Sequence, residues 1–166
     1  FGGITKGLLE VKNMKRKIVG ISISMMLTLT ALSLSASSYE TSENIIYVDD
    51  DFLVENATHK KTIQAGVNAA QPGDTVFVYN GTYYERVTLT KTINLTGEDK
   101  NSTIIDGSNQ RESALLINSV DVIVSGFKFK NGWYGGIESK SADSQIIGNV
   151  FEKCSPGLLI YNAYGN

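Results

Sequence analysis

Two consecutive 22-residue segments of this chain repeat one another without a gap. Ser119–Lys140 has the sequence SVDVIVSGFKFKNGWYGGIESK, and Ser141–Asn162 has the sequence SADSQIIGNVFEKCSPGLLIYN. Because stacked strands lie about 4.8 Å apart, such a repeat places each inward side chain on its equivalent one turn earlier. The repeat therefore predicts a solenoid. The identical pairs are Ser119/Ser141, Asp121/Asp143, Gly126/Gly148, Phe129/Phe151 and Gly135/Gly157, and the similar pairs are Val124/Ile146 and Ile137/Leu159.

These pairs also predict details of the interior. Phe129 is expected to stack on Phe151 as an aromatic ladder in the core, and Gly126 and Gly148 are expected at corners. Other short β-rich segments, separated by Gly, Asn and Asp, suit a sandwich or a barrel as well as a solenoid, and the repeat favours the solenoid. The expected strands are Ile45–Val48, Thr75–Tyr79, Val87–Leu89, Ile93–Leu95, Thr103–Ile105, Ala114–Ile117, Val122–Val124, Phe127–Phe129, Ile137–Ser139, Gln145–Ile147, Val150–Phe151 and Leu158–Tyr161.

One segment has a helical period. Ile63, Val67 and Ala70 are spaced at i, i+4 and i+7, which predicts a short amphipathic helix over Thr62–Ala70. Thr62 is the expected N-cap, and a Pro-Gly pair ends the helix with a turn. The chain is therefore expected to be all-β with one short helix.

Residues 14–38 have the composition of a secretory signal peptide. A basic stretch, Met14–Lys17, precedes a largely apolar run that ends in small residues. An uncleaved membrane anchor is the alternative, although Ser and Thr within the run make it polar for a membrane span. Residues 1–13 are interpreted as a translated upstream leader and residues 39–44 as a flexible lead-in, so the folded domain is expected over residues 45–166.

Removal of the leader and the signal peptide changes the charge of the chain. Five of the 15 basic residues and one of the 17 acidic residues precede Tyr39, which leaves a net charge of about −6. Nucleic acid is therefore not an expected partner, and membrane contact is expected only through the signal peptide. Cys154 is the single cysteine, so no internal disulfide forms, and such a thiol is commonly a small buried apolar group.

One long stretch of the chain resembles a known family. It comprises YVDDDF, then KTIQAGVNAAQPGDTVFVYNGTYYERVTLTKTINLTGEDKNSTIIDG up to Gly107, followed by VIVSGFKFKNG and IIGNVFEKC. This stretch is similar to the exported right-handed parallel β-helix proteins of the pectin-lyase-like, NosD-type group. The resemblance implies an all-β right-handed parallel β-helix with coils of about 22 residues. It also implies that the helix at Thr62–Ala70 caps the N-terminal end of the solenoid, and that the protein is secreted, at the cell surface or periplasmic.

The second copy of the repeat ends at Asn162, close to the end of the sequence. An uncovered solenoid edge invites strand addition and aggregation, so a second cap is needed. We therefore expect this chain to be the N-terminal part of a longer protein, whose C-terminal coils would pack on the coils present here.

The NosD-type resemblance raises copper binding, and the residue types argue against it. Copper favours Cys, Met and His ligands, and the chain after residue 38 holds Cys154, His59 and no Met. His59 is expected to be a solvated loop residue beside Lys60 and Lys61. We therefore expect no copper site and no other cofactor in this segment.

The resemblance also raises polysaccharide cleavage, because many right-handed β-helices are lyases or glycoside hydrolases. It implies acidic calcium ligands and a basic proton acceptor for a lyase, but Arg86 and Arg111 lie beside no clear acidic cluster in repeat phase. Asp121 and Asp143 share a phase and are candidates for a metal site or for a retaining pair about 5 Å apart. Each follows Ser-x before a strand, however, where an Asp side chain ordinarily caps a turn.

Asp49 and Asp51, in YVDDDF, are a further pair of candidate metal ligands. Side chains alternate along an extended strand, so these two share a face and Asp50 points the other way. A calcium loop requires further oxygen ligands and a glycine-containing spacing. The stretch is therefore interpreted as an edge guard, whose charges keep an exposed strand edge from pairing with other chains.

Trp133 and Tyr134 are the candidate ligand-binding residues. Asn-Gly precedes them and Gly-Gly follows, which predicts a turn on which exposed rings could stack against sugars. Four N-x-[ST] sequons are candidate glycosylation sites in loops. They are Asn56, Asn80, Asn94 and Asn101.

We therefore expect an exported surface scaffold or adhesion module that binds polysaccharide or cell-surface glycan and is not catalytic in this segment. Two alternatives stay open. One is a polysaccharide lyase or glycoside hydrolase whose active coils lie outside this segment, and the other is a NosD-like periplasmic copper-maturation protein.

Overall fold

The computed structural model describes residues 43–108, 111–141 and 143–161. The predicted leader (1–13) and signal peptide (14–38) lie outside the described residues. Most of the predicted lead-in does too. Its last residue, Asn44, is described and is held in place, because its N–H and its side-chain amide both donate to Asp74 Oδ1 at 3.1 and 3.2 Å.

The described strands form three parallel sheets. The six-stranded sheet has the order β12 (Gln145–Ile147), β9 (Ile123–Ser125), β6 (Asn94–Gly97), β3 (Thr75–Val78), β1 (Ile45–Val48), β2 (His59–Lys60). The second sheet has the order β13 (Val150–Glu152), β10 (Lys128–Lys130), β7 (Thr103–Asp106), β4 (Gly81–Tyr83). The third has the order β14 (Leu158–Ile160), β11 (Ile137–Ser139), β8 (Leu115–Ile117), β5 (Val87–Leu89).

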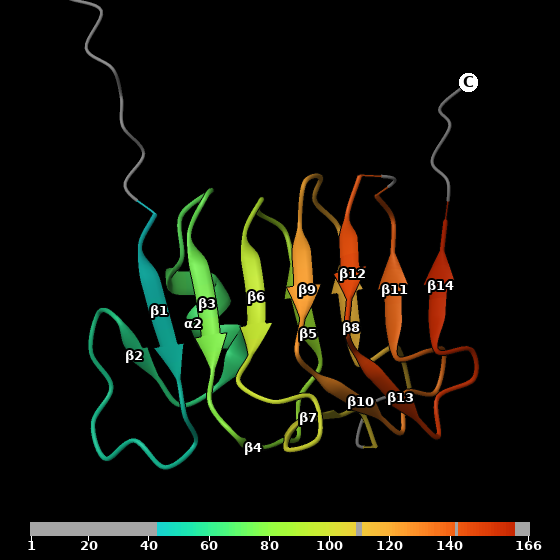
Figure 1. Cartoon of the computed structure of the whole chain (residues 1–166), viewed down its shortest axis with the longest axis horizontal. Coiled ribbons are helices and arrows are strands. Elements are labelled where there is room, and N and C mark those ends of the chain that lie inside the picture. The colour runs from blue at the N-terminus through green and yellow to red at the C-terminus, as the bar shows by residue number, and fades with distance from the viewer. Residues whose placement is uncertain (1–42, 109–110, 142, 162–166) are drawn as a thin grey trace, which may run out of the picture. The chain divides into compact units, whose positions relative to one another are not determined.

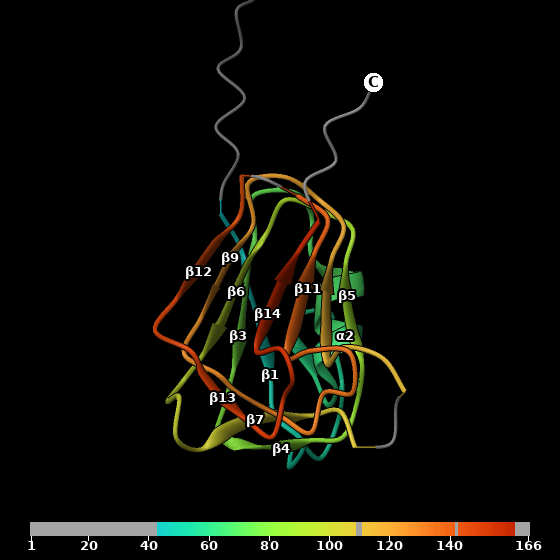
Figure 2. The same cartoon turned by 90° about the vertical axis from the view of Figure 1, so that its right-hand side faces the viewer.

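From β3 onward, successive strands visit the three sheets in turn. The runs β3–β4–β5, β6–β7–β8, β9–β10–β11 and β12–β13–β14 each contribute one strand to every sheet. Figure 1 shows the strands of the six-stranded sheet side by side, and Figure 2 looks along the stack, with one sheet on each side and the β13 sheet below. This arrangement is consistent with a parallel β-solenoid.

Rows of equivalent side chains fill the space between the sheets. Phe129 is fully buried, and its ring stacks on Phe151 with centroids 5.6 Å apart and 21° between the planes, so the predicted aromatic ladder is confirmed. The inward rows are Ile46, Val76, Leu95, Val124 and Ile146; Tyr83, Ile105, Phe129 and Phe151; Val87, Leu115, Ile137 and Leu158; and Leu89, Ile117, Ser139 and Ile160.

Glycines mark the sharp corner between the first and second sheets. Gly126 and Gly148 have φ values of 78° and 63°, a left-handed conformation that glycine adopts without steric cost, so the predicted corners are confirmed. The predicted pairing of Gly135 with Gly157 is wrong. The Ile137 N–H donates to the Gly157 carbonyl at 3.0 Å, which aligns Gly157 with Gly136 instead.

That shift arises in the last turn of the chain. Ile137 pairs with Leu158, 21 residues later, and not with Leu159 as the gapless repeat predicts. Five residues, 153–157, join β13 to β14, whereas six residues, 131–136, join β10 to β11. Because side chains alternate along a strand, the missing residue turns Leu158 inward and Leu159 outward.

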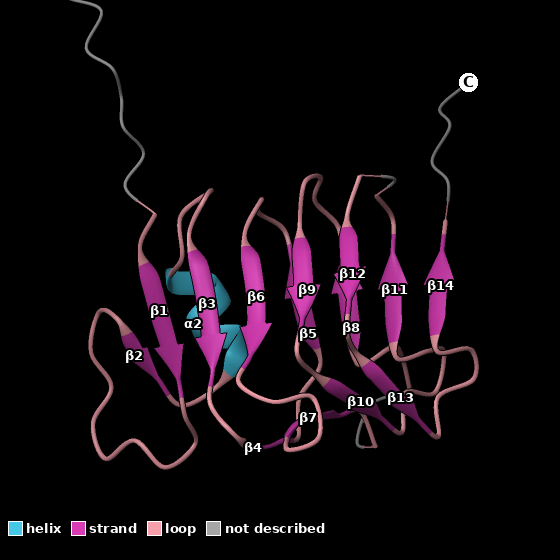
Figure 3. Cartoon of the chain, viewed as in Figure 1, coloured by secondary structure: helices cyan, strands magenta, loops and turns pink. Residues whose placement is uncertain are grey.

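The predicted helix is present as α2 (Ile63–Ala69), which Figure 3 shows behind β1 and β3. Thr62 is its N-cap, as predicted, and the Thr62 hydroxyl accepts a hydrogen bond from the Ala65 N–H at 3.2 Å. Gly66 permits the close packing of the helix on the sheet, because a Cβ there would lie 2.6 Å from a methyl group of Val48.

Two side chains that flank β5 hold the ends of α2. The Glu85 carboxylate accepts hydrogen bonds from the N–H groups of Ile63 and Gln64 at 2.8 and 3.0 Å. Lys91 Nζ donates to three carbonyls at the other end, including that of Ala70 at 2.7 Å. A carboxylate at the N-terminus and an ammonium at the C-terminus both complement the helix dipole.

The side chain of Gln64 completes the edge of the third sheet. Its Oε1 accepts from the Thr88 N–H at 2.7 Å, and its Nε2 donates to the Thr88 carbonyl at 3.3 Å. One amide side chain thus takes the place of a neighbouring strand beside β5. The helix therefore covers the N-terminal end of the solenoid through hydrogen bonds as well as through apolar contact.

The stretch YVDDDF has a different geometry from the one predicted. The strand ends at Val48, and Asp51 lies in a turn, with its N–H donating to Asp49 Oδ1 at 3.0 Å. Strand β1 pairs with β3 on one side and with β2 on the other. Strand β2 pairs with Tyr47 and Val48 of β1 and is itself the edge of the sheet, so the edge-guard interpretation of the neighbouring charges stays a prediction.

Exposure rises toward the other end of the stack. Phe151 is 36% exposed although its equivalent Phe129 is fully buried, and Leu158 and Ile160 are 37% and 53% exposed in rows that are buried elsewhere. Strands β12, β13 and β14 are the last in their sheets among the described residues. The apolar interior therefore reaches the surface at this end.

Candidate functional site

Trp133 and Tyr134 lie in the connection between β10 and β11, and they are 69% and 59% exposed. The prediction that both rings project from a turn is confirmed. A hollow of about 470 Å³ opens beside Trp133. Its lining comes from the connections that follow β7, β10 and β13, and consists of Ser108, Asn131, Gly132, Trp133, Lys153 and Ser155. We call this surface the corner hollow.

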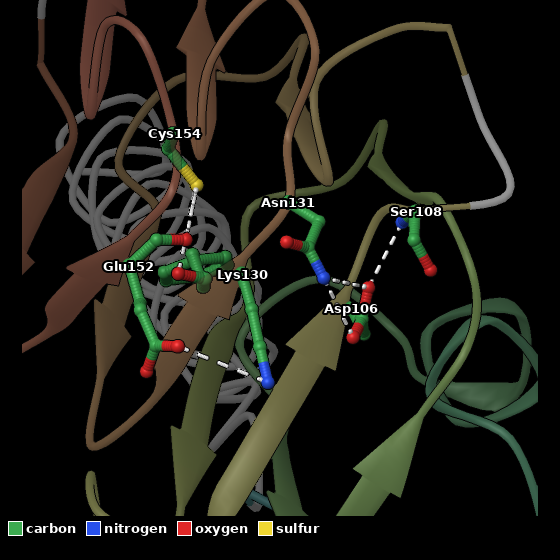
Figure 4. A network of polar contacts seen from close by, with 7 residues as sticks. Asp106, Ser108, Lys130, Asn131, Glu152 and Cys154 are labelled. Atoms are coloured by element: carbon green, nitrogen blue, oxygen red, sulfur yellow. Dashed lines mark hydrogen bonds and ion pairs between the residues drawn. The ribbon is translucent and has the colours of Figure 1, made fainter.

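Asp106 lies beneath Asn131 and Ser108, two residues that line the corner hollow, as Figure 4 shows. Its carboxylate accepts two hydrogen bonds from the Asn131 side chain, at 3.0 and 3.1 Å, and one from the Ser108 N–H at 2.9 Å. Burial alone would raise the pKa of Asp106, but these hydrogen bonds and the charge of Lys130 outweigh it and lower the pKa. The carboxylate is therefore ionised and fixes the Asn131 side chain in one orientation.

Lys130, Glu152 and Cys154 lie to one side of this network (Figure 4). Lys130 Nζ lies 3.8 Å from Glu152 Oε1. The Cys154 thiol is half-buried against the core, accepts a weak hydrogen bond from the Gly132 N–H at 3.4 Å, and has its pKa raised by burial. A raised pKa keeps the thiol protonated, and its contact with the core agrees with the predicted packing role.

The predicted acidic pairs are not brought together into a metal centre. Asp49 and Asp51 share a turn, in which one carboxylate accepts from the backbone N–H of the other residue. Asp121 and Asp143 are exposed in equivalent turns before β9 and β12. Among the described residues, no three His, Cys, Asp or Glu side chains lie close enough to hold one metal ion.

In the turn before β12, the Ser141 hydroxyl accepts a hydrogen bond from the Asp143 N–H at 3.4 Å, so Ser141 caps this turn. A capping role for the Asp143 carboxylate stays a prediction. Arg86 Nη1 forms an ion pair with one acidic residue, Glu112, whose Oε2 lies 2.6 Å away. Sequence spacing gave no sign of this pair, since the two residues belong to neighbouring coils.

The four sequons occupy different environments. Asn56, Asn80 and Asn101 are exposed outside the strands, as predicted. Asn94 is half-buried at the start of β6, and its Nδ2 donates to Thr75 Oγ1 at 3.3 Å. The prediction that all four lie in loops is therefore wrong for Asn94.

A second surface was missed by the sequence analysis. Five rings gather on the outer face of the six-stranded sheet, where Tyr47 and Tyr79 stack with centroids 6.1 Å apart and Phe77 meets Tyr79 edge-to-face at 5.2 Å. The other two rings are Phe52 and His59, whose centroids are 5.0 Å apart. The prediction of a solvated loop position for His59 is wrong, because it lies half-buried in β2, opposite Tyr47.

This aromatic surface includes a second hollow of about 350 Å³. Its lining consists of Ile45, Tyr47, Thr75, Phe77 and Tyr79. The alternation of side chains along β1 and β3 could have predicted this surface. Because Ile46 and Val76 are buried, the residues beside them in each strand must face outward.

Comparison with known protein families, with curated proteins and with solved structures finds no match to this chain. Within the part of the chain that the structure describes, no helix has both the length and the apolar composition needed to cross a bilayer.

Proposed function

We propose that the chain is a right-handed parallel β-helix of the pectin-lyase-like, NosD-type group. Pairs of strands offset by 22 residues, such as Phe129 with Phe151 and Ile146 with Val124, support a coil of about that length. Parallel strand–crossover–strand connections are right-handed in nearly all proteins, which supports the handedness.

We further propose that this β-helix is an exported surface scaffold that binds carbohydrate without cleaving it. The observation that carries the proposal is the corner hollow. An indole ring that is 69% exposed stands beside hydroxyl, amide and ammonium groups of Ser108, Asn131 and Lys153. An exposed aromatic face next to hydrogen-bond donors suits a sugar ring, which presents C–H groups on one side and hydroxyls at its rim.

The chemistry of the corner hollow favours binding over cleavage. A general acid needs a carboxyl group whose pKa is raised toward the working pH, and the pKa of Asp106 is lowered. The three hydrogen bonds from the Asn131 side chain and the Ser108 N–H also occupy the oxygens that would have to act on a substrate. Asp106 is therefore assigned a structural role beneath Asn131.

Trp133 is the single tryptophan of the chain and is a built-in probe of this site. Titration of the full chain with a panel of oligosaccharides, followed by tryptophan emission, should identify sugars that change the emission and saturate. Trp133→Ala and Lys153→Ala should each weaken binding of such a sugar about tenfold, measured by calorimetry.

Tyr84→Ala is the matched control for the loss of an exposed ring, because Tyr84 is 64% exposed and lies outside the corner hollow. It should leave the affinity unchanged. A chain that binds no glycan on an array, or a Trp133→Ala variant that binds as tightly as the parent, would contradict the proposal.

A further inference from the structure

The outer face of the six-stranded sheet carries two rows of side chains that run across the strands. Each row joins residues that the parallel register places side by side, from β1 or β2 to β12. The first row is His59, Tyr47, Phe77, Thr96, Ser125 and Ile147. The second row is Ile45, Thr75, Asn94, Ile123 and Gln145.

Neither row contains a Lys, Arg, Asp or Glu residue. The outer face of the second sheet differs, since Lys128, Lys130 and Glu152 project from it. Charged side chains are the commonest residues on protein surfaces, so an outer sheet face of aromatic, hydroxyl and amide groups is unusual. Such a face provides few charged groups that could pair with an ionic ligand.

The aromatic end of the face is already organised. Tyr47 contacts His59, Phe77 and Tyr79 at centroid distances of 5.4, 6.2 and 6.1 Å, and all four side chains are half-buried. Rings that hold one another in place lose little freedom when a ligand stacks on them. The hollow of about 350 Å³ lies among these rings and is open to solvent beside the exposed Ile45.

The polar groups at its margin also restrict the ligand. The Thr75 hydroxyl donates to Glu43 Oε1 at 2.5 Å, and Asn94 Nδ2 donates to the same hydroxyl. The Glu43 carboxylate would repel an acidic polymer at this margin. Hydroxyl and amide side chains can both donate and accept, which matches the hydroxyl groups of a neutral sugar.

We propose that the outer face of the six-stranded sheet binds a neutral glycan chain, with one sugar ring stacked among Tyr47, Phe77 and Tyr79 and the chain extending across β6 and β9. Neighbouring strands are about 4.8 Å apart, close to the length of one sugar unit in an extended glycan. Each strand crossed therefore presents one further side chain from each row to the next sugar. Thr96 and Ser125 are the next contacts in the first row.

A peptide is a poorer occupant of the same face. A peptide strand binds to a sheet through backbone groups that are free at an edge, and here the face, not an edge, is offered. The backbone groups of β3 and β6 are already engaged on both sides. Recognition must come from side chains alone, and those present are suited to rings and hydroxyls.

This site is independent of the corner hollow and shares no residue with it. The two sites can therefore be tested apart in the full chain. Neutral oligosaccharides of increasing length, from gluco-, manno-, xylo- and N-acetylglucosamine series, are titrated by calorimetry while tryptophan emission is followed. Binding to the sheet face should release heat without changing the emission of Trp133.

Tyr79→Ala should weaken this binding about tenfold or more, because it removes a stacking ring, whereas Tyr79→Phe should retain the affinity. Tyr84→Ala is the control and should have no effect, since Tyr84 lies outside this hollow. Trp133→Ala should likewise leave the affinity unchanged. Thermal melting checks that each variant is folded.

Thr96→Lys tests the path of the chain, because Thr96 is half-buried, faces outward and lies next to Phe77. A long charged side chain there should abolish the gain in affinity of longer oligosaccharides over short ones, and it leaves the core untouched. The proposal is overturned if no neutral oligosaccharide binds, if acidic polymers bind better, or if neither Tyr79→Ala nor Thr96→Lys changes the affinity of a neutral one.

Discussion

Lys153 has a backbone conformation that suits other residue types better. Its φ is 54°, the same value as that of Asn131 one coil earlier. Asparagine adopts the left-handed region readily, whereas for most L-residues it costs about 1–2 kcal/mol. A strained lysine that lines the corner hollow is consistent with a residue kept for its ammonium group and not for stability.

Lys153→Gly should therefore raise the free energy of unfolding by about 1 kcal/mol, because glycine takes a positive φ without strain. The measurement is the midpoint of urea unfolding. Lys100→Gly, at an exposed turn position without a positive φ, should lower the midpoint or leave it unchanged. A Lys153→Gly variant that is less stable than the parent would show that the side chain contributes packing that outweighs the strain.

Asp74 is a buried carboxylate that joins the segment before β1 to the segment after α2. It accepts hydrogen bonds from the Gln71 N–H at 2.7 Å and from both donors of Asn44. Burial would raise the pKa of Asp74, but these hydrogen bonds and the charge of Lys91 lower it below 3.8. A carboxyl group whose folded pKa is depressed adds stability above its unfolded pKa, and this contribution disappears as the pH falls through the folded pKa.

Asp74→Asn should cost about 1.5–3 kcal/mol at neutral pH, because charge-assisted hydrogen bonds are lost. The cost should shrink below pH 3.8, where the parent loses the same contribution as its carboxylate becomes protonated. Urea unfolding across the pH range measures both effects. Asp143→Asn, at an exposed turn, is the control, and an equal pH dependence in both variants would argue against this role for Asp74.

At the scale of elements, α2 is held by the first coil and not by its own length. A helix of seven residues is too short to be stable alone. Its two ends and one side are bonded by Glu85, Lys91 and Gln64, of which the first two flank β5. The helix and β5 therefore form one unit, and loss of either should release the other.

Glu85→Ala should cost about 1–3 kcal/mol, because it leaves the N–H groups of Ile63 and Gln64 without their acceptor in a partly buried place. Thermal unfolding followed by circular dichroism measures the loss. Glu98→Ala is the matched control, since the Glu98 carboxylate also accepts a backbone N–H but is exposed. Equal losses in the two variants would contradict this role of Glu85. We call the hydrogen bonds by which Glu85, Lys91 and Gln64 hold α2 against β5 the clamp.

The sequence predicted these elements unevenly, for physical reasons. The pairing of Phe129 with Phe151 was predicted correctly, because identical core residues at equivalent positions of the repeat allow only one alignment of the two strands. Leu159 was misplaced because the one-residue-shorter turn after β13 leaves no trace in a gapless comparison. The strands β2 and β4 were not expected, since two or three polar or glycine-containing residues lack any alternation that a sequence pattern can reveal.

The candidate sites were also predicted unevenly from the sequence. Trp133 was found because glycines on both sides of it predict an exposed turn. The aromatic surface was not, since Tyr47 and Phe77 are 30 residues apart and become neighbours only through the pairing of β1 with β3. The clamp by Glu85 was hidden for the same reason, because its partners lie 21 and 22 residues earlier in the sequence.

At the scale of the whole molecule, the two ends of the described stack differ. At one end α2 and β2 cover the first coil, and at the other Phe151, Leu158 and Ile160 are partly exposed beside the edges of three sheets. Unpaired edges and exposed apolar side chains both promote association. The open end of the described stack is therefore expected to promote self-association as the concentration rises.

Leu158→Lys combined with Ile160→Lys should reduce that association, because charges at an open edge oppose pairing. Sedimentation velocity over a range of concentrations measures the effect, and the lysines should cost little stability, since both positions are already partly exposed. Thr88→Lys in β5, whose edge is covered by Gln64, is the control. A parent chain that stays monomeric at high concentration would contradict the expectation.

The clamp on α2 also has a consequence for the order of events in time. All of its partners lie between Ile63 and Lys91, so the first coil has everything it needs to close before the rest of the chain has been synthesised. Each later coil then meets a finished edge and needs only its own residues to add to it. Assembly can thus proceed one coil after another, from the amino end of the chain.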